Sequence, residues 1–420
     1  MEEGYTVQKA LIEAQRCLMC ADAPCTCDCP AGVDARGFIR KIRFENFDGA
    51  IKLLKTNNIL AASCAYICPV GSQCAKGCIA AGLTRPIDIA GLQRFVTDYE
   101  RHRGMIEPVT PKRDGKKVAV IGSGPAGLGC AAELAVRGHI VTVFESGAEI
   151  GGMLRKVIPS FRLPPDVLDF EVQFIKKLGV EFECLKTVEN PQALLSQGFD
   201  AVFLGTGLQK PQGGDLIGSR LAGVHQALDF LSMSKGGQMP DPGKRAVVIG
   251  GGDTAIDAAR VSKRAGAESF ILYRRTQREM PAYAEEIEAA WNDGVEFYFR
   301  ILVRSVVGTD KVTGVRCVRI RWRDPVPGTE RAYEVEGAEF VIPCDTVIYA
   351  TGQAPAHDFG LRINPDGFTA VHKETMMTSA QGVFAGGDCV TGGGTAAWAV
   401  GSGKKAAIEI DKYLKDSPPL

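Results

Sequence analysis

The stretch KVAVIGSGPAGLGCAAELAVRGHIVTVFES (117–146) decides the fold of the chain. Its apolar start, KVAVI, predicts a buried strand, and a glycine-rich turn follows directly. The apolar segments beyond the turn predict a helix and then a second strand. The same plan returns in KRAVVIGGGDTAIDAARVSKRAGAESFILYRR (244–275). These two units are the internal repeat of the chain, and they predict an α/β fold with parallel strands joined by helices.

The turn of the first unit has the spacing GxGxxG. Its residues are Gly122, Ser123, Gly124, Pro125, Ala126 and Gly127. The first glycine permits the tight turn, the second lets the backbone approach a pyrophosphate, and the third lets helix and strand pack closely. The helix N-terminus offers free N–H groups to phosphates. Glu145 ends the second strand, 23 residues after Gly122, where a carboxylate can hold a ribose diol. A turn that serves packing alone is the alternative.

Two further segments identify the dinucleotide expected at the first unit. Gly151 and Gly152 follow Glu145 closely in EIGGML (149–154), a pattern typical of FAD-binding proteins with two dinucleotide folds. The segment GVFAGGDCV (382–390) resembles the second FAD motif of such proteins, in which Asp388 meets the ribityl–phosphate chain. The sequence after Gly152, MLRKVIPSFRLP, has no cysteine pair. We therefore expect electrons to leave this flavin by a route other than a disulfide.

The second unit predicts a nicotinamide dinucleotide site. Its turn has the spacing GxGxxA, formed by Gly250, Gly252 and Ala255. We place Arg274 at the position equivalent to Glu145, with Arg275 after it and Arg278 close by. A carboxylate would repel a 2′-phosphate, whereas a guanidinium binds one through two hydrogen bonds. This favours NADP(H) over NAD(H), with merely solvated arginines as the alternative.

Cysteines are concentrated near the N-terminus, where nine of the 14 fall between Cys17 and Cys78. RCLMCADAPCTCDCP contains Cys17, Cys20, Cys25, Cys27 and Cys29, and SCAYICPVGSQCAKGC contains Cys64, Cys68, Cys74 and Cys78. Cys-x2-Cys spacing and a proline after Cys29 and Cys68 are features of ferredoxin-type clusters. Zinc is the alternative, but it would leave the flavin without an electron outlet. Nine cysteines exceed the eight that two tetranuclear clusters need, so spacing alone leaves the ligand set open.

Composition narrows the class of protein. Lys+Arg and Asp+Glu both number 49 among 420 residues, so a zero net charge gives no support for nucleic-acid binding. No apolar run is long enough for a membrane span and no signal pattern opens the chain, so we expect a cytoplasmic protein.

The first part of the chain is expected to be helical. Residues 1 to about 100 predict helices, with apolar side chains at helical spacing: Phe38, Ile42, Phe47, Ile51 and Leu54. Residues 107–117 predict a linker.

Several motifs together resemble one family. They are RCLMCADAPCTCDCP, CxxxCPxxxxCxxxC, PIDIAGLQRF, GSGPAG, IPSFRLP and VFAGGDCV. The family is the flavin and iron–sulfur module shared by the glutamate synthase small subunit and the N-terminal half of dihydropyrimidine dehydrogenase. PIDIAGLQRFVTDYE (86–100) is most similar to the free-standing, PreT-type flavin subunits of the bacterial dehydrogenase. Gln93 is decisive, because a glutamine there ligates a cluster iron in that branch, where the glutamate synthase branch tends to have glutamate.

The resemblance implies a ligand set and an architecture. It implies one [4Fe–4S] cluster on Cys17, Cys20, Cys25 and Cys78, and a second on Cys29, Cys68, Cys74 and Gln93. Cys64 matches a cysteine that is not a ligand, and Cys27 has no counterpart. The resemblance also adds residues to the two dinucleotide sites. The residues expected to bind FAD then include Ile67, Met153, Arg162, Val188 and the stretch Gly387 to Ala396, which includes Thr395. The residues expected to bind the nicotinamide dinucleotide then include Gly251, Asp253 and Thr254.

The resemblance implies three domains. We expect an α-helical di-cluster iron–sulfur domain at 1–110, a discontinuous Rossmann-like FAD domain at 111–225 and 350–420, and a Rossmann-like NAD(P)H domain at 226–349.

The implied function is the electron-input subunit of dihydropyrimidine dehydrogenase. NAD(P)H would reduce FAD at the flavin N5 without a catalytic side chain, and the two clusters would pass electrons to an FMN and iron–sulfur partner subunit that reduces uracil or thymine. PreT-type subunits typically use NAD, so the pair Arg274–Arg275 leaves the choice between NADP(H) and NAD(H) open. The alternatives are a glutamate synthase small subunit, a bifurcating or sulfide dehydrogenase-like subunit, and a non-catalytic redox sensor.

Overall fold

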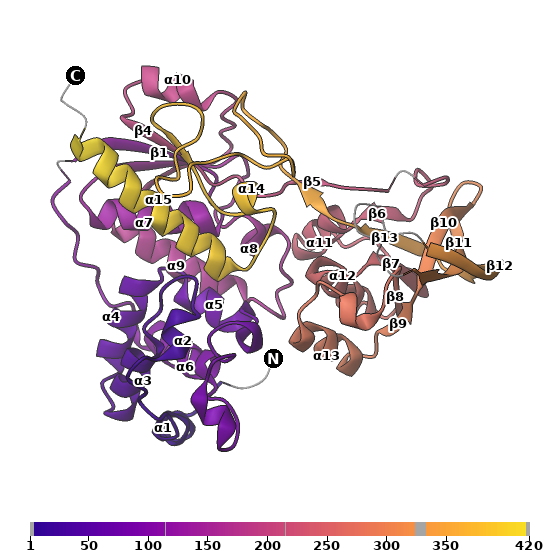
Figure 1. Ribbon diagram of the computed structural model, residues 1–420, viewed down its shortest axis with the longest axis horizontal. Coiled ribbons are helices and arrows are strands. Elements are labelled where there is room, and N and C mark those ends of the chain that lie inside the picture. The colour runs from indigo at the N-terminus through magenta and orange to yellow at the C-terminus, as the bar shows by residue number, and fades with distance from the viewer. Residues whose placement is uncertain (1–3, 114, 215, 324–332, 417–420) are drawn as a thin grey trace. The chain divides into compact units, whose positions relative to one another are not determined.

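The computed structural model describes residues 4–113, 115–214, 216–323 and 333–416. The chain forms two compact units (Figure 1). The first comprises Met1–Arg155, Ser160–Gln209 and Ala354–Leu420, and the second comprises Lys156–Pro159 and Lys210–Gln353. A pair of two-residue strands, β5 (Lys210–Pro211) and β14 (Gln353–Ala354), forms a small sheet of its own where the chain passes between the units.

The N-terminal part of the first unit is helical, as the sequence predicts. Its helices are α1 (Val7–Gln15), α2 (Pro24–Cys27), α3 (Ala35–Arg43), α4 (Phe47–Asn57), α5 (Ala61–Ile67) and α6 (Ile89–Arg103), with the 3-10 turns η1 (Val70–Ser72) and η2 (Ile79–Gly82). Phe38 and Ile42 on α3 and Ile51 and Leu54 on α4 form its core. The helical spacing is interrupted between α3 and α4, because Glu45 has a φ of +56° and the Asn46 side chain caps α4.

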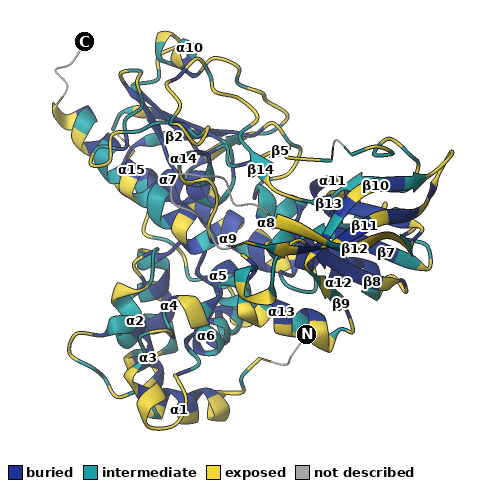
Figure 2. Ribbon diagram, turned by 45° about the vertical axis from the view of Figure 1, so that its right-hand side comes forward, coloured by how far each residue is buried: buried dark blue, intermediate teal, exposed yellow. Residues whose placement is uncertain are grey.

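The rest of the first unit is built on a parallel sheet with the strand order β15-β4-β1-β2-β3. The strands are β1 (Lys117–Ile121), β2 (Ile140–Phe144), β3 (Glu181–Glu183), β4 (Ala201–Leu204) and β15 (Val383–Ala385). The helices are α7 (Pro125–Val136), α8 (Met153–Lys156), α9 (Pro165–Lys177), α10 (Pro191–Ser196), α14 (Asp388–Thr391) and α15 (Ala396–Asp416). The central strands β1 and β4 are almost entirely buried (Figure 2), which explains their uninterrupted apolar sequences.

The second unit repeats this plan with the parallel order β6-β13-β7-β8-β9. Its strands are β6 (Val224–Gln226), β7 (Arg245–Gly250), β8 (Glu268–Tyr273), β9 (Glu296–Phe299) and β13 (Thr346–Ala350), and its helices are α11 (Ala227–Lys235), α12 (Asp253–Arg264), η3 (Gln277–Glu279) and α13 (Ala284–Asn292). Strands β1 and β7 occupy the same central position in the strand orders of their two sheets. Each is followed by the glycine turn and helix that the sequence predicts. The internal repeat is therefore a repeat of structure.

The second unit also contains an antiparallel sheet that the sequence analysis missed. It consists of β10 (Ile301–Gly308), β11 (Val312–Trp322) and β12 (Tyr333–Pro343). β12 is exposed along almost its whole length and is rich in charged residues, so no apolar alternation marks it as a strand. Backbone pairing with β11, rather than burial, fixes its position.

Helix α15 lies against two other backbones of the first unit. A Cβ atom on Gly403 would lie 2.0 Å from the carbonyl oxygen of Ala126 on α7, and one on Gly401 would lie 2.1 Å from the carbonyl oxygen of Pro30. Lys404 then donates hydrogen bonds to the carbonyl oxygens of Ala31 and Asn57. One helix thus joins the sheet to the cysteine-rich segment.

We expect Gly403→Ala to destabilise the first unit by about 1–3 kcal/mol, because its methyl group would overlap backbone rather than a flexible side chain. The measurement is the Tm of the protein. Gly82→Ala is the control, since a Cβ there meets no atom within 4 Å, and its Tm should be unchanged. Equal Tm values for Gly403→Ala and the wild type would contradict the close approach of α15.

Candidate redox site

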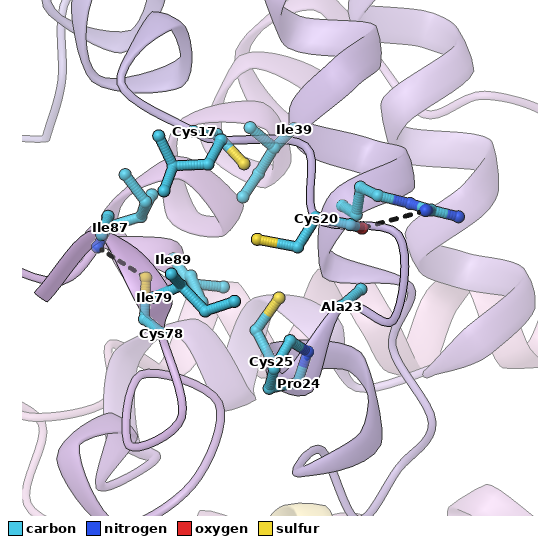
Figure 3. A pocket seen from close by; sticks show the side chains of 13 residues that line it. Cys17, Cys20, Ala23, Pro24, Cys25, Ile39, Cys78, Ile79, Ile87 and Ile89 are labelled. Atoms are coloured by element: carbon cyan, nitrogen blue, oxygen red, sulfur yellow. Dashed lines mark hydrogen bonds between the residues drawn. The ribbon is translucent and has the colours of Figure 1, made fainter. Parts of the chain in front are cut away.

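Four cysteines face one hollow in the N-terminal helices, called here the first thiol hollow. It is lined by Cys17, Cys20, Cys25 and Cys78 together with apolar side chains that include Ile39 and Ile87. Figure 3 shows the four sulfur atoms pointing toward the space between them. Met19 and Ala23 in the intervening loop have φ values of +53° and +33°, which turn the chain so that these thiols face inward.

The surroundings of two of these thiols, Cys17 and Cys25, oppose their ionisation in the free protein. Burial raises the pKa of Cys17, and it raises the pKa of Cys25 to about 11. Such thiols become thiolates only when a cation compensates for the lost solvation, and iron does so. Four thiols around a shared hollow are the donor set of a [4Fe–4S] cluster, so the residues fit that group.

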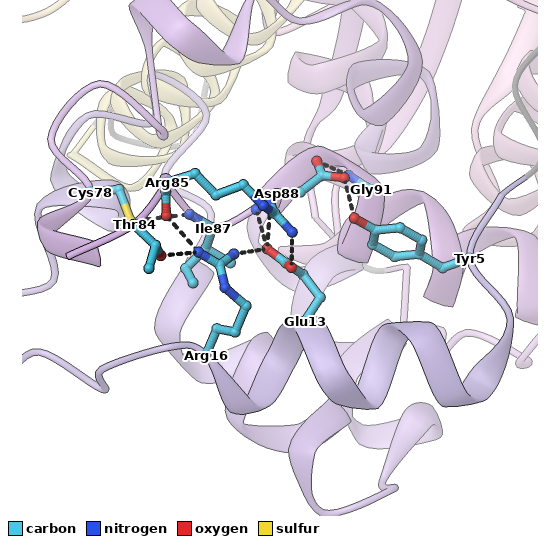
Figure 4. A network of polar contacts seen from close by, with 9 residues as sticks. All are labelled: Tyr5, Glu13, Arg16, Cys78, Thr84, Arg85, Ile87, Asp88 and Gly91. Carbon is cyan, nitrogen blue, oxygen red and sulfur yellow. Dashed lines mark hydrogen bonds and ion pairs between the residues drawn. The ribbon is translucent and has the colours of Figure 1, made fainter. Parts of the chain in front are cut away.

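A network of charged side chains fixes the segment that follows Cys78 (Figure 4). The buried carboxylate of Glu13 on α1 accepts hydrogen bonds from Arg16 (2.6 Å), from Arg85 (2.6 and 3.1 Å) and from the backbone N–H of Asp88 (2.8 Å). Asp88 in turn caps α6 through the N–H of Gly91. The network holds the loop after Cys78 and the helix that contains Gln93 in one arrangement.

A second thiol hollow lies nearer to the sheet of the first unit. It is lined by Cys29, Cys68, Cys74 and Gln93, and also by Cys64. Burial raises the pKa of Cys29 and raises that of Cys74 to about 12, as in the first hollow. The Gln93 amide nitrogen donates a 2.5 Å hydrogen bond to the carbonyl oxygen of Ala61, so its Oε1 is the atom left for a ligand.

The structure separates the two cysteines whose roles the sequence left open. Cys64 is buried in the second hollow, and hydrogen bonding with Cys68 together with burial raises its pKa well above the usual range. Cys27 lines neither hollow; it is exposed, with its sulfur 3.7 Å from the carbonyl oxygen of Asp22. Across the described ranges, no three His, Cys, Asp or Glu side chains are close enough together to hold a single metal ion.

The second thiol hollow adjoins the segment predicted to bind FAD. Ala397 on the first turn of α15 lines the hollow itself. Gln73, also in the lining, donates a buried 2.7 Å hydrogen bond from its amide to the hydroxyl of Thr395. The stretch Gly387 to Ala396 therefore ends at the wall of the second hollow, and residues that lie far apart in sequence meet there.

The predicted FAD residues converge on the first turn of α7. A Cβ on Gly152 would lie 2.7 Å from Cα of Gly124, and one on Gly387 would lie 2.7 Å from Cβ of Ala126. The Ser123 hydroxyl donates to the Glu145 carboxylate (2.6 Å) and accepts from the N–H of Gly151 (3.0 Å). A Cβ on Gly124, in contrast, would meet only the carbonyl oxygen of Gly205 within 4 Å, at 3.9 Å, so a ligand can approach this side of the backbone. These features fit a dinucleotide.

The other predicted FAD residues lie on segments of the same unit. Ile67 ends α5, Met153 begins α8, Arg162 lies on the loop before α9, and Val188 packs on the apolar cluster beneath the sheet. Gly127 permits the contact between helix and strand, since a Cβ there would lie 1.9 Å from the carbonyl oxygen of Gly122. Asp388 begins α14, and burial raises its pKa to about 6.

The second glycine turn has the same form in the second unit. A Cβ on Gly250 would lie 2.3 Å from the carbonyl oxygen of Ala350, whereas one on Gly252 would have no neighbour nearer than 3.9 Å. Gly252 caps α12, whose first residues are Asp253, Thr254 and Ala255. Asp253 accepts from the N–H of Tyr283 (3.1 Å) and Thr254 accepts from Gln353 (3.2 Å). The open backbone at Gly252 fits the approach of a pyrophosphate.

The strand register corrects one predicted equivalence. Gly122 directly follows the pair Ile121–Phe144, and continuing that register sets it opposite Glu145. Continuing the register of β7 and β8 in the same way sets Gly250 opposite Tyr273, one residue before Arg274. The position equivalent to Glu145 is thus held by Tyr273, whose ring packs against Gly251. Placing Arg274 there was wrong by one residue, since Tyr273 lies 23 residues after Gly250, the same spacing as Glu145 has from Gly122.

Arg275 is the arginine whose surroundings fit an anionic group. Its Nε is buried and has no hydrogen-bond partner among the described residues. The guanidinium lies 5.8 Å from the ring centre of Trp322, and the Trp322 indole N–H donates to the backbone carbonyl of Arg274 (2.6 Å). Arg274 and Arg278 are exposed. A partly buried guanidinium with an unused donor fits a 2′-phosphate.

Glu171 is a buried residue of this region that was not predicted from the sequence. This carboxylate is buried on α9, where it accepts hydrogen bonds from the N–H groups of Ala62 (2.7 Å) and Ser63 (3.2 Å) and from the Ser63 hydroxyl (2.5 Å). It caps α5, the helix between the second thiol hollow and α9. Its position on the apolar face of α9, among Val167, Leu168, Val172 and Ile175, is the signal that could have identified it.

Two family models match the two parts of the chain. The family model "dihydropyrimidine dehydrogenase domain II, 4Fe-4S cluster" matches residues 1–105, and "pyridine nucleotide-disulphide oxidoreductase" matches residues 116–403. The NAD-dependent dihydropyrimidine dehydrogenase subunit PreT of Escherichia coli (strain K12) is 38% identical over 98% of this chain and 96% of its own length. The NADP(+)-dependent formate dehydrogenase subunit beta of Moorella thermoacetica is 36% identical over 94% of this chain, which spans only 60% of that relative.

A solved structure shows the same dinucleotide folds. Mycobacterium tuberculosis FprA in complex with NADPH is 18% identical, with a TM-score of 0.60 over 72% of this chain and 85% of that chain. The family matches define an NAD(P)H-dependent oxidoreductase that uses FAD, [4Fe–4S] iron–sulfur centres and a nicotinamide dinucleotide. The chain belongs to the pyridine nucleotide-disulphide oxidoreductase family, in the branch that contains PreT. None of its described helices has the length and apolar character needed to cross a membrane.

Glu171 predicts a distinctive dependence of stability on pH. Burial raises its pKa from 4.5 to about 7, so between these values the folded protein keeps a proton that the unfolded chain releases. Stability must therefore fall as the pH rises through this window, and Glu171→Gln should flatten the fall. The measurement is Tm between about pH 5 and 8. The control, Glu189→Gln at an exposed site, should follow the wild type; a Glu171→Gln curve parallel to the wild type would contradict the burial of this proton.

Proposed function

We propose that the chain is the electron-input subunit of a dihydropyrimidine dehydrogenase. It would oxidise NAD(P)H and pass electrons to an FMN and iron–sulfur partner subunit that reduces uracil or thymine to the 5,6-dihydro product. The observation that supports this best is the second thiol hollow, which adjoins the predicted FAD segment through the 2.7 Å Gln73–Thr395 hydrogen bond. The name and nearly full-length match of the PreT relative support the substrate class.

We propose the domains with their sequence-based boundaries: iron–sulfur at 1–110, FAD at 111–225 and 350–420, and NAD(P)H at 226–349. The main segment of the compact second unit is longer than this last domain, because it begins at Lys210 and ends at Gln353. The first thiol hollow would hold one [4Fe–4S] cluster through its four cysteines. The second would hold another through Cys29, Cys68, Cys74 and the Oε1 of Gln93. Cys64 would stay a thiol beside this cluster. A neutral oxygen in place of a thiolate changes the charge of the second cluster and therefore its potential.

Bound FAD would supply the acceptor for a hydride from NAD(P)H, and bound clusters would supply one-electron relays. The side chains and backbone of this protein would bind the two dinucleotides and orient them. The N-terminus of α7 and the backbone of Gly124 would meet the FAD pyrophosphate, and Glu145, held by Ser123, would accept from a ribose. In the second unit, Gly252 and the N-terminus of α12 would do the same for the nicotinamide dinucleotide.

We further propose that NADPH is the preferred donor. Arg275→Ala should lower kcat/KM for NADPH about tenfold or more and leave that for NADH unchanged, because only the 2′-phosphate would lose a charged hydrogen bond. Steady-state reduction of ferricyanide measures both values. Arg220→Ala, at an exposed position of the same unit, is the control. Equal kcat/KM for the two donors, with no effect of Arg275→Ala, would exclude this preference.

Assays with uracil test whether the pyrimidine site lies on the partner subunit rather than on this chain. The purified chain with NADPH should reduce ferricyanide but not uracil, because we assign the pyrimidine site to its partner. The complex copurified with the chain should reduce uracil, with one NADPH consumed for each dihydrouracil formed. Uracil reduction by the isolated chain would refute the proposal. Activity of the complex with glutamine and 2-oxoglutarate instead of uracil would assign the chain to glutamate synthesis.

A further inference from the structure

The first thiol hollow lies at the surface of the N-terminal helices. Two residues of its lining, Leu18 and Ile79, are 46% and 54% exposed, although both are large and apolar. They follow the ligand candidates Cys17 and Cys78 directly in sequence. The second hollow, in contrast, is walled by Ala397 of α15. Of the two hollows, the first is therefore the one with large apolar side chains exposed at its rim.

A surface depression, distinct from both thiol hollows, adjoins the first thiol hollow and shares Arg36 with it. Arg36, Arg40, Arg43 and Phe44 line this depression, and they come from α3 and its C-terminal end. Phe44 is 72% exposed. Arg36 donates to the carbonyl oxygens of Cys20 (3.0 Å) and Ala21 (2.9 Å), so the arginine cluster is attached to the loop that supplies the first hollow.

The charge of this depression is not compensated within the described chain. Arg40 and Arg43 have no ion pair with a described residue. The one carboxylate in the lining, Asp34, accepts the N–H of Gly37 at 2.8 Å and serves as the N-cap of α3. Asp22 and Glu45 are exposed at the edges of the same segments. Three guanidinium groups thus face one capping carboxylate.

We propose that Leu18, Ile79, Arg36, Arg40, Arg43 and Phe44 form the docking surface for the electron-accepting protein, and that this acceptor presents carboxylates around its own redox centre. Arginine and aromatic side chains with apolar neighbours are the composition of a protein–protein interface. Charge complementarity selects an acidic partner and would speed its association. This inference rests on the proposed function, because it assumes that electrons leave through the first thiol hollow.

The test compares two small haem proteins of opposite charge as probes, acidic cytochrome b5 and basic cytochrome c. One NADPH supplies two electrons and reduces two ferric haems, with NADP⁺ and a proton as the other products. For the wild type, the rate with cytochrome b5 should fall as salt is raised. Arg40→Glu/Phe44→Ser should lower that rate about tenfold at low salt and should not lower the rate with cytochrome c. A lower rate with cytochrome b5 alone would indicate a charge effect, because damage to the fold would lower the rates with both cytochromes.

The control variant Lys52→Glu/Val109→Ser also reverses one positive charge and replaces one apolar side chain by serine, at exposed positions outside both hollows, and should behave as the wild type. If NADPH fails to reduce ferricyanide in the wild type, the proposed function fails. If ferricyanide is reduced but cytochrome b5 is not, or if Arg40→Glu/Phe44→Ser reduces cytochrome b5 at the wild-type rate, the docking surface is refuted. A change of oligomeric state in Arg40→Glu/Phe44→Ser would assign the surface to a second copy of the chain and likewise overturn the proposal.

Discussion

The close approach of α15 to two backbones is the constraint on which the first unit depends. Gly401 and Gly403 leave no room for a side chain, so the helix contacts Pro30 on one side and Ala126 on the other. Pro30 follows Cys29 of the second thiol hollow, and Ala126 lies on the first turn of α7 in the predicted FAD loop. A larger residue at either glycine would separate the cysteine-rich segment from the dinucleotide fold. The packing of one helix thus brings the second thiol hollow and the predicted FAD loop together.

The arrangement of the sites follows from this packing. The second thiol hollow adjoins α15 and the end of the FAD segment, whereas the first opens at the surface beside α3. The Glu13 network and the Asp88 cap hold α1, the loop after Cys78 and α6 together, so both hollows belong to one helical core. Single electrons move only over short distances, and this order therefore supports a path from the flavin through the second hollow to the first.

Much of the fold could be predicted because it depends on local patterns. The two glycine turns, their strands and their helices follow from apolar runs and from the backbone freedom of Gly122 and Gly250, both of which have positive φ values. The antiparallel strand β12 could not be predicted, because its position depends on pairing with β11 rather than on burial. The misplacement of Arg274 has a different cause. Tyr273 lies as far from Gly250 as Glu145 lies from Gly122, 23 residues, so the spacing in the sequence already points to Tyr273 and the register of β7 and β8 agrees.

The candidate site was predicted unevenly for similar reasons. Cys-x2-Cys spacing indicated clusters, but it could not divide nine cysteines between two hollows; that division came from the family resemblance, and the cysteines it assigns to each cluster face one hollow. The ligand role of Gln93 stays a prediction. Its amide nitrogen donates a hydrogen bond to the carbonyl oxygen of Ala61, which leaves its Oε1 for a ligand. The burial of Glu171 could have been predicted from its position on the apolar face of α9, but its partners on α5 could not, because they are distant in sequence. The unpartnered Nε of Arg275 could not be predicted, because it is defined by burial and by distant neighbours.

We propose that electrons reach the first thiol hollow only through the second. Electron paramagnetic resonance of freeze-quenched samples tests it most directly, with iron content measured for each variant. In Cys74→Ser, which disables the second hollow, the first cluster should be reduced by dithionite but not by NADPH. In Cys20→Ser, which disables the first hollow, NADPH should still reduce the second cluster. Reduction of the first cluster by NADPH at the wild-type rate in Cys74→Ser would contradict the account.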